Sequence, residues 1–411
     1  MTLPNETDRV AGNAPLGFLV FLALMTSVVA LTIDAILPAM DAISDDLAFA
    51  KTSDRHLLVL LVFAGIGVGQ LVFGPLADAI GRKRTAIIGW SIYIVGTVLA
   101  MTAGGIWGIM LGRVLQGFGA AGPRVVANAI VRDCYEGRAM ARIISLIMTV
   151  FMLVPLLAPM IGQGLELLGG WRAIFALYLA MAMVCAGWYL ADIPETLTEK
   201  NRRPLSVRPM ALAFREVLST RKTMLYTAGS ASIFASFAAF LSAAQQIYEG
   251  IYGLGELFPL IFAATAASFA VAQYANSRLV MRVGMRPLCR IAALMVMVSA
   301  TSVLVLSMIF FGPVPPFWAF FGGLFPIFIG SALMFSNLTA LALDPLGHVA
   351  GTASAVVMSA SMLTGVPIGM IAARQVDGTV LPILGSFAIL GTMTLVFIVL
   401  ADRSPDRRED M

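Results

Sequence analysis

The sequence contains very little charge for its length. Only 12% of its 411 residues are Asp, Glu, Lys or Arg, whereas 59% are hydrophobic. Charged residues make up about a quarter of a typical soluble domain, so this composition excludes that class of protein. Such a chain is expected to form membrane-spanning helices, because a helix satisfies its own backbone hydrogen bonds inside a bilayer. We therefore predict an all-α integral membrane protein.

Cysteine and histidine are also scarce. The 3 Cys lie in or beside apolar runs, at Cys134, Cys185 and Cys289, and the 2 His are far apart in sequence. An odd, scattered set of cysteines favours neither a disulfide framework nor a metal cluster. We expect no metal site and no cofactor. Because neither histidine has a catalytic partner nearby in the sequence, a membrane enzyme is an alternative that we do not favour.

Apolar runs as long as a membrane span fill most of the chain. A polar, basic stretch at residues 192–222 separates them into two groups and is predicted to be a cytoplasmic linker. We expect an N-terminal six-helix bundle at 1–191 and a C-terminal six-helix bundle at 223–411. The twelve predicted transmembrane helices lie at about residues 16–40, 57–77, 85–103, 107–131, 139–165, 173–191, 224–248, 257–277, 288–311, 317–342, 350–373 and 380–400.

The positions of Lys and Arg test this topology. Most of the 27 basic residues fall on the side of the membrane that contains both termini. Cytoplasmic loops carry such an excess, so we expect both termini in the cytoplasm. The net charge of +4 follows from this placement and does not indicate nucleic-acid binding. The basic residues expected on the opposite side are Lys51, Arg55, Arg172 and Arg374.

Charged residues inside predicted helices are rare and are the first candidates for function. Asp34 is a carboxylate well inside an apolar run, where an unpaired Asp costs about 2.5–3.5 kcal/mol. Carboxylates removed from water hold protons more tightly, which suits proton binding and release near neutral pH. We predict that Asp34 couples transport to protons and contacts substrate. The alternative is a polar residue near the interface, or half of a structural pair.

Two arginines lie inside the fourth predicted helix. Arg113 and Arg124 are 11 residues apart, so they differ by about 20° around the helix and face the same interior space. Arg124 is a candidate for bidentate binding of an anionic or strongly polar substrate group. The alternative places it near the cytoplasmic end, paired with an acid. Asn128 shares roughly its face, and we name both as candidate substrate-binding residues.

Residues 74–83 read Gly-Pro-Leu-Ala-Asp-Ala-Ile-Gly-Arg-Lys between the second and third predicted helices. This stretch resembles the major facilitator superfamily pattern Gly-x-x-x-Asp-x-x-Gly-Arg-Lys/Arg. In that family the loop belongs to a cytoplasmic charge network that stabilises the outward-open state. The resemblance implies gating roles for Gly74, Asp78, Gly81, Arg82 and Lys83, and for Arg132 and Arg138 after the fourth helix.

Two further helices carry motifs similar to those of antiporters in this superfamily. Arg113 begins a match to the pattern Arg-x-x-Gln-Gly-x-Gly-Ala. The match implies that its charge influences the proton affinity of a nearby acid; the alternative is a structural charge joining helices 1 and 4. The fifth helix partly resembles Gly-Pro-x-x-Gly-Gly, with Ala158 in place of the first Gly and Gln163 interrupting the last pair. It implies conformational roles for Pro159 and Gly162.

The second half carries a degenerate copy of the loop motif. Residues 276–287 follow the eighth predicted helix and keep Gly284 and Arg286, but Met281 stands where Asp78 stands in the first half. This pattern fits two six-helix pseudo-repeats of the major facilitator fold, with the substrate site at their interface.

Several stretches, among them residues 32–40, 129–133 and 171–175, are similar to the Bcr/CflA branch of the drug:proton antiporters. The resemblance implies a proton-coupled secondary transporter that exports small amphipathic or drug-like compounds by alternating access across the bacterial inner membrane. Its partners would be a small-molecule substrate, protons and the lipid bilayer, and the family usually functions as monomers. The alternative is proton-coupled uptake or exchange of an anionic metabolite or siderophore-like compound, with Arg113 and Arg124 as the anion clamp.

Overall fold

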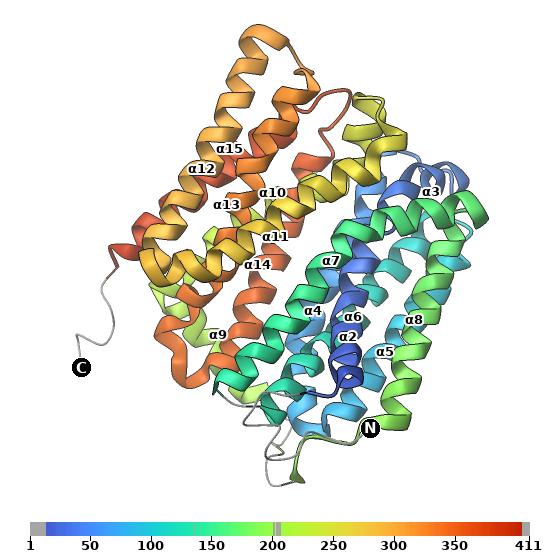
Figure 1. The fold of residues 1–411 in the computed structure, drawn as a ribbon, viewed down its shortest axis with the longest axis vertical. Coiled ribbons are helices and arrows are strands. Elements are labelled where there is room, and N and C mark those ends of the chain that lie inside the picture. The colour runs from blue at the N-terminus through green and yellow to red at the C-terminus, as the bar shows by residue number, and fades with distance from the viewer. Residues whose placement is uncertain (1–13, 136, 200–201, 203–206, 405–411) are drawn as a thin grey trace. The chain divides into compact units, whose positions relative to one another are not determined.

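The computed structural model describes residues 14–135, 137–199, 202 and 207–404. Within these residues every regular element is a helix (Figure 1). Twelve of the described helices have 19 or more residues. They are α2 (Leu16–Asp34), α4 (Leu57–Ile80), α5 (Arg82–Met101), α6 (Ile106–Cys134), α7 (Gly137–Gly169), α8 (Trp171–Asp192), α10 (Arg221–Gln245), α11 (Phe258–Val283), α12 (Met285–Leu306), α13 (Phe317–Leu343), α14 (Ala350–Ala373) and α15 (Leu381–Asp402).

Ten spans in the described residues are long and apolar enough to cross a membrane. The two long helices outside this set are α6 and α7. Charged residues such as Arg113 and Arg124 lower the hydropathy of α6, and the described apolar stretch of α7 is only Leu153–Gly169. Length therefore identifies the same twelve helices that the sequence predicts, whereas hydropathy alone misses the two helices of the antiporter-like motifs.

The first predicted helix, residues 16–40, ends as an α-helix at Asp34. Pro38 lies four residues later, so it has no N–H for the Asp34 carbonyl and its ring crowds that oxygen. The chain turns into the 3-10 helix η1 (Leu37–Ala39) and then α3 (Met40–Asp46). The continuous first helix of the sequence prediction is wrong at this point, because Asp34 occupies the last turn of a broken helix.

The link between α4 and α5 is shorter than the sequence predicts. α4 continues to Ile80 and α5 begins at Arg82, so Gly81 alone separates them. Its φ of 101° and ψ of 161° are a conformation that glycine adopts at no steric cost. Gly284, between α11 and α12, has a φ of 85° and a ψ of 159°. The same turn at corresponding places in the two halves supports the predicted pseudo-repeat.

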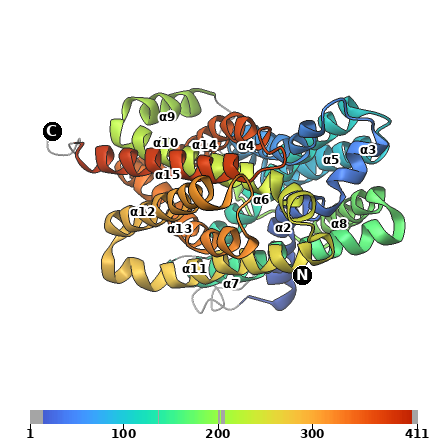
Figure 2. The same ribbon diagram turned by 90° about the horizontal axis from the view of Figure 1, so that it is seen from above.

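The chain divides into two compact units. Unit 1 comprises Met1–Ala50 and Leu61–Val207, and unit 2 comprises Lys51–Leu60 and Arg208–Met411. In unit 1, α2 packs on α6, α7 and α8, and α5 packs on α6 and α8. In unit 2, α10 packs on α13, α14 and α15, and α12 packs on α13 and α15, as Figures 1 and 2 show.

Among its described residues, the predicted linker at 192–222 contains α9 (Val207–Ser219), and α10 already begins at Arg221. The domain boundaries at 1–191 and 223–411 stay a prediction.

Candidate functional site

Arg113 is fully buried in unit 1, where it joins α6 to α2. Its side chain is 0% exposed. One guanidinium nitrogen donates to the carbonyl oxygen of Thr32 at 2.8 Å, and another donates to Oε1 of Gln116 at 2.9 Å. Gln116 in turn donates through Nε2 to Oγ1 of Thr97 on α5 at 2.9 Å. These bonds run to neutral oxygens, so a permanent positive charge is held next to the last turn of α2.

Two tyrosines complete the polar centre around Thr32. The Tyr93 and Thr32 hydroxyl oxygens lie 2.6 Å apart. The Tyr178 hydroxyl donates to the Leu31 carbonyl at 3.2 Å. Both tyrosines are 0% exposed and lie on α5 and α8. Side chains from three other helices therefore contact α2 within one turn of Asp34.

Asp34 lies at the end of α2 and is 5% exposed. Among the described residues no hydrogen bond or ion pair reaches its carboxyl group. Arg113 instead bonds the backbone two residues earlier, at Thr32. The structure thus brings the predicted acid and the predicted arginine to the same turn of α2 without joining them directly. Their predicted coupling stays a prediction.

The backbone beside Asp34 is fixed by a close approach of α7. Gly162 is buried, and a Cβ atom built on it would overlap the carbonyl oxygen of Ala35. Glycine is therefore required here for α7 to lie against α2. Pro159, also buried, lies one turn earlier on α7. The partial antiporter motif thus lies directly beside the candidate proton site.

Arg124 and Asn128 lie further along α6, away from the Arg113 centre. Arg124 is partly exposed and Asn128 is exposed. No hydrogen bond or ion pair to Arg124 is found within the described part of the chain. The structure therefore leaves its guanidinium open to an anionic or polar group, and the substrate-binding role of both residues stays a prediction.

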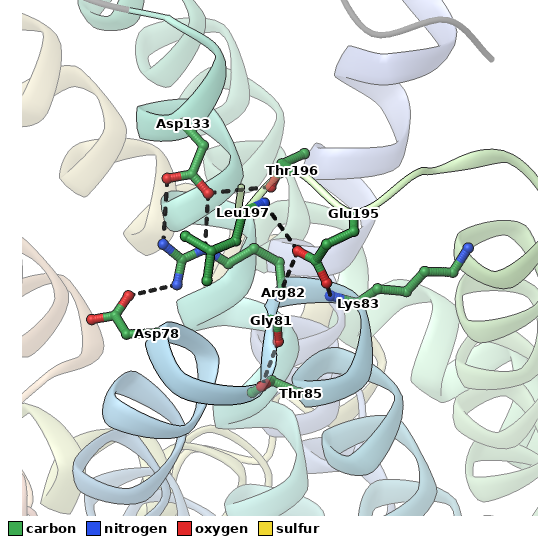
Figure 3. Close-up of polar contacts among 9 residues, drawn as sticks. All are labelled: Asp78, Gly81, Arg82, Lys83, Thr85, Asp133, Glu195, Thr196 and Leu197. Atoms are coloured by element: carbon green, nitrogen blue, oxygen red, sulfur yellow. Dashed lines mark hydrogen bonds and ion pairs between the residues drawn. The ribbon is translucent and has the colours of Figure 1, made fainter. Parts of the chain in front are cut away.

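A separate polar cluster surrounds Arg82 at the α4–α5 turn (Figure 3). Its side chain is 3% exposed and pairs with Asp78 at 2.6 Å and with Asp133 at 2.8 Å. Thr196 donates to the same Asp133 carboxylate at 3.2 Å. A nearly buried arginine with two acidic partners ties α4, α5 and α6 together.

Glu195, just after α8, accepts hydrogen bonds from the first backbone N–H groups of α5. Its two oxygens accept from the N–H of Arg82 at 2.8 Å and of Lys83 at 3.2 Å. Charged acceptors at a helix N-terminus satisfy unpaired donors and complement the helix dipole. A Cβ on Gly81 would overlap Oε2 of Glu195, so the glycine also makes room for this carboxylate (Figure 3). Lys83 donates through Nζ to the Ile193 carbonyl at 2.9 Å.

The cluster differs from the network that the sequence predicts. Asp78 and Arg82 form the expected pair, but the further acids are Asp133 and Glu195, which the sequence analysis did not name. Arg132 is exposed on the last turn of α6. The side chain of Arg138 lies outside the described residues. A Cβ on Gly74 would meet no atom within 4 Å, so packing gives no reason for glycine at that position.

The role of Glu195 gives a direct stability prediction. We expect Glu195→Gln to lower the free energy of unfolding by about 1 kcal/mol, because a charged acceptor at the start of α5 becomes a neutral one. Glu199→Gln is the matched control, since Glu199 is exposed on the same segment. Thermal unfolding of the purified proteins measures both. Equal unfolding temperatures for the two variants would contradict the capping role.

Comparison with known proteins decides the family. The sequence profile of the Major Facilitator Superfamily matches residues 22–370. The chain belongs to the major facilitator superfamily. A bicyclomycin resistance protein homolog of Haemophilus influenzae is 27% identical over 386 residues, covering 93% of this chain and 96% of the relative. A chloramphenicol resistance protein of Pseudomonas aeruginosa is 32% identical over 360 residues, covering 83% of this chain and 79% of the relative.

Solved structures agree on the fold. A crystal structure of a peptide transporter in complex with sulfate superposes with a TM-score of 0.74 at 15% identity, covering 96% of each chain. The predicted twelve-helix major facilitator fold is confirmed, as is membership of the drug:proton antiporter branch. This major facilitator protein is therefore a multi-pass membrane protein.

Proposed function

We propose that this protein exports small amphipathic, drug-like compounds in exchange for protons by alternating access. The observation that carries the proposal is the buried carboxyl of Asp34, which has no hydrogen-bond partner in the described residues and lies next to the buried Arg113 centre. Relatives named for bicyclomycin and chloramphenicol resistance support export of this class of compound.

Asp34 is the proposed proton site. A buried carboxyl group without a hydrogen-bond donor is far more stable neutral than charged. It therefore keeps its proton until a charged or polar group of the substrate displaces that proton. Arg113 is held on the same turn of α2 by the carbonyl of Thr32, two residues before Asp34. Its positive charge favours release of the proton once the site opens to water or substrate. Because α2 ends at Asp34, the backbone that follows lacks regular α-helical hydrogen bonds. Such a backbone suits a proton site whose surroundings change during transport.

The Arg82 cluster is the proposed gating element. Asp78, Arg82 and Asp133 come from three helices of unit 1, so movement of one helix against the others must break at least one of their contacts. We propose that the cluster holds one conformational state of the transporter. We keep the proposed gating roles of the loop residues Gly74, Gly81, Lys83, Arg132 and Arg138. Pro159 and Gly162, which lie on α7 beside Asp34, keep their proposed conformational roles.

Cellular context follows from the family. We propose a bacterial inner-membrane location with both termini in the cytoplasm, a monomeric state and no enzymatic activity. The partners are a small-molecule substrate, protons and the lipid bilayer.

The second candidate function is exchange or uptake of an anionic compound. The observation that favours it is the partly exposed guanidinium of Arg124, which has no partner among the described residues. In this function Arg124 and Asn128 would bind the anion. The exporter remains the better supported proposal, because the drug-resistance relatives and the buried acid point to it together.

Substrate-triggered proton release from the purified, detergent-solubilised protein tests the proposal. We expect neutral or cationic amphipathic compounds to release protons into a weakly buffered solution. Binding of such compounds without any proton release would contradict antiport. If only anions bind, and Arg124→Ala abolishes that binding, the anion carrier replaces the exporter.

A further inference from the structure

Three partly exposed phenylalanines meet in unit 2. Phe237 of α10 lies 5.9 Å from Phe269 of α11 and 5.5 Å from Phe335 of α13, measured between ring centroids. Phe269 and Phe335 are 6.0 Å apart. Phe328, only 5% exposed, supports Phe237 from the same helix as Phe335. The three rings form one aromatic surface. Each ring stays partly exposed, and Phe328 packs against Phe237.

A row of uncharged polar side chains begins next to these rings. Gln273 follows Phe269 by four residues on α11, so both lie on one face of that helix. Ser336 donates to Oε1 of Gln273 at 3.4 Å, and Asn276 donates through Nδ2 to Ser336 at 3.3 Å. Asn337, 4% exposed, donates to Oδ1 of Asn276 at 2.7 Å. The row joins α11 to α13 over about one helical turn.

This row has unused hydrogen-bonding capacity. The side-chain N–H groups of Gln273 make no hydrogen bond within the described residues, and its bond to Ser336 is long. The four polar side chains bond only to neutral groups there. A ligand can therefore find free donors and acceptors but no charge.

α11 has two different faces, one with Val271 and one with Phe269 and Gln273, and their chemistry indicates what each can contact. Val271 is 64% exposed and lies about 200° around the helix from both Phe269 and Gln273. An apolar face of this kind suits lipid. Exposed amides are poorly placed against hydrocarbon. The face with the rings and amides is therefore better suited to water or a ligand than to lipid.

We propose that Phe237, Phe269 and Phe335, with Gln273, Asn276 and Ser336, bind an uncharged aromatic compound that carries hydrogen-bonding groups. The inference rests on the proposed exporter function and names its substrate class. The ligand ring stacks on the phenylalanines, and its carbonyl or hydroxyl groups bond the amides of α11. Cations without polar groups contact the rings alone.

Two probes separate these contributions in binding assays on the purified full-length protein. Radiolabelled chloramphenicol is a neutral aromatic compound with amide and hydroxyl groups, and tetraphenylphosphonium is an aromatic cation without them. We expect Phe335→Ala to weaken binding of both about tenfold, the effect of one lost aromatic contact. We expect Gln273→Leu to weaken chloramphenicol binding several-fold and to leave tetraphenylphosphonium binding unchanged.

Phe321→Ala is the matched control. Phe321 is a partly exposed phenylalanine on the same helix, in contact with Phe317 and Phe325 rather than with the three rings. Its substitution should change neither affinity. Equal effects of Phe321→Ala and Phe335→Ala, or absence of chloramphenicol binding to the unaltered protein, would overturn the assignment.

Proton release measured on the same samples separates this site from the transport mechanism. Chloramphenicol-triggered proton release with unchanged binding in Phe335→Ala and Gln273→Leu overturns the site and leaves the exporter intact. Binding that responds to both substitutions without any proton release overturns proton exchange and leaves the site intact.

Discussion

In the Asp34→Asn variant we expect no substrate-triggered proton release and no proton-driven export. The substitution keeps the size and hydrogen-bonding shape of the side chain but removes its titration. Asp34 is 5% exposed, and no other carboxylate contacts the Arg113 centre in the hydrogen bonds described above. We therefore expect that no other group takes over the proton.

Substrate binding separates loss of coupling from loss of folding in this variant. Neutral compounds should still bind, because the substitution removes the proton-binding carboxyl group and not a charge that a neutral compound needs. Asp45→Asn is the control, since Asp45 is exposed on α3, which follows α2 in the chain. It should release protons as the unaltered protein does. Normal proton release by Asp34→Asn would exclude this residue as the proton site.

The second large effect is expected from Gly162→Ala. A methyl group at this position would overlap the Ala35 carbonyl oxygen, which belongs to backbone and cannot rotate away. α7 must then move off α2, and such overpacking costs about 1–3 kcal/mol. Because Ala35 follows Asp34 directly, the shift should also reduce proton release. Thermal unfolding and the proton-release assay measure the two consequences.

Gly164→Ala provides the matched control on the same helix. A Cβ at Gly164 meets no atom within 4 Å, so the variant should be neutral or more stable by up to about 1 kcal/mol, from helix propensity alone. A Gly162→Ala protein as stable as Gly164→Ala would show that α7 does not need this close approach.

Most of the fold could be predicted because a lipid bilayer excludes unpaired polar backbone, which leaves apolar helices as the spanning structure. Apolar run length located twelve helices, with ends mostly within a few residues of the observed ones. The exception at Asp34 had a local signal in Pro38, four residues later, which the hydropathy of the run concealed. α6 illustrates a different problem, because Arg113 and Arg124 lower its hydropathy and it is not among the ten apolar spans of the described residues.

The candidate site could be predicted only in part. The rarity of charge inside apolar helices identified Asp34 and Arg113, but Arg113 bonds a backbone carbonyl, which every residue has and no sequence motif marks. The loop motif identified Arg82, whereas its partners Asp133 and Glu195 come from distant segments. Nothing local distinguishes those acids from other charges at helix ends.

The sequence by itself determined that this chain crosses a membrane, where its helices lie and which charges are buried among them, because lipid excludes polar backbone and unpaired charge wherever they occur. Tertiary structure alone decided which groups meet. It placed Arg113 on Thr32 rather than on Asp34, set Gly162 against Ala35, and gathered three phenylalanines from three helices. Such contacts depend on how helices far apart in the chain pack, and hydrophobic periodicity leaves that choice open.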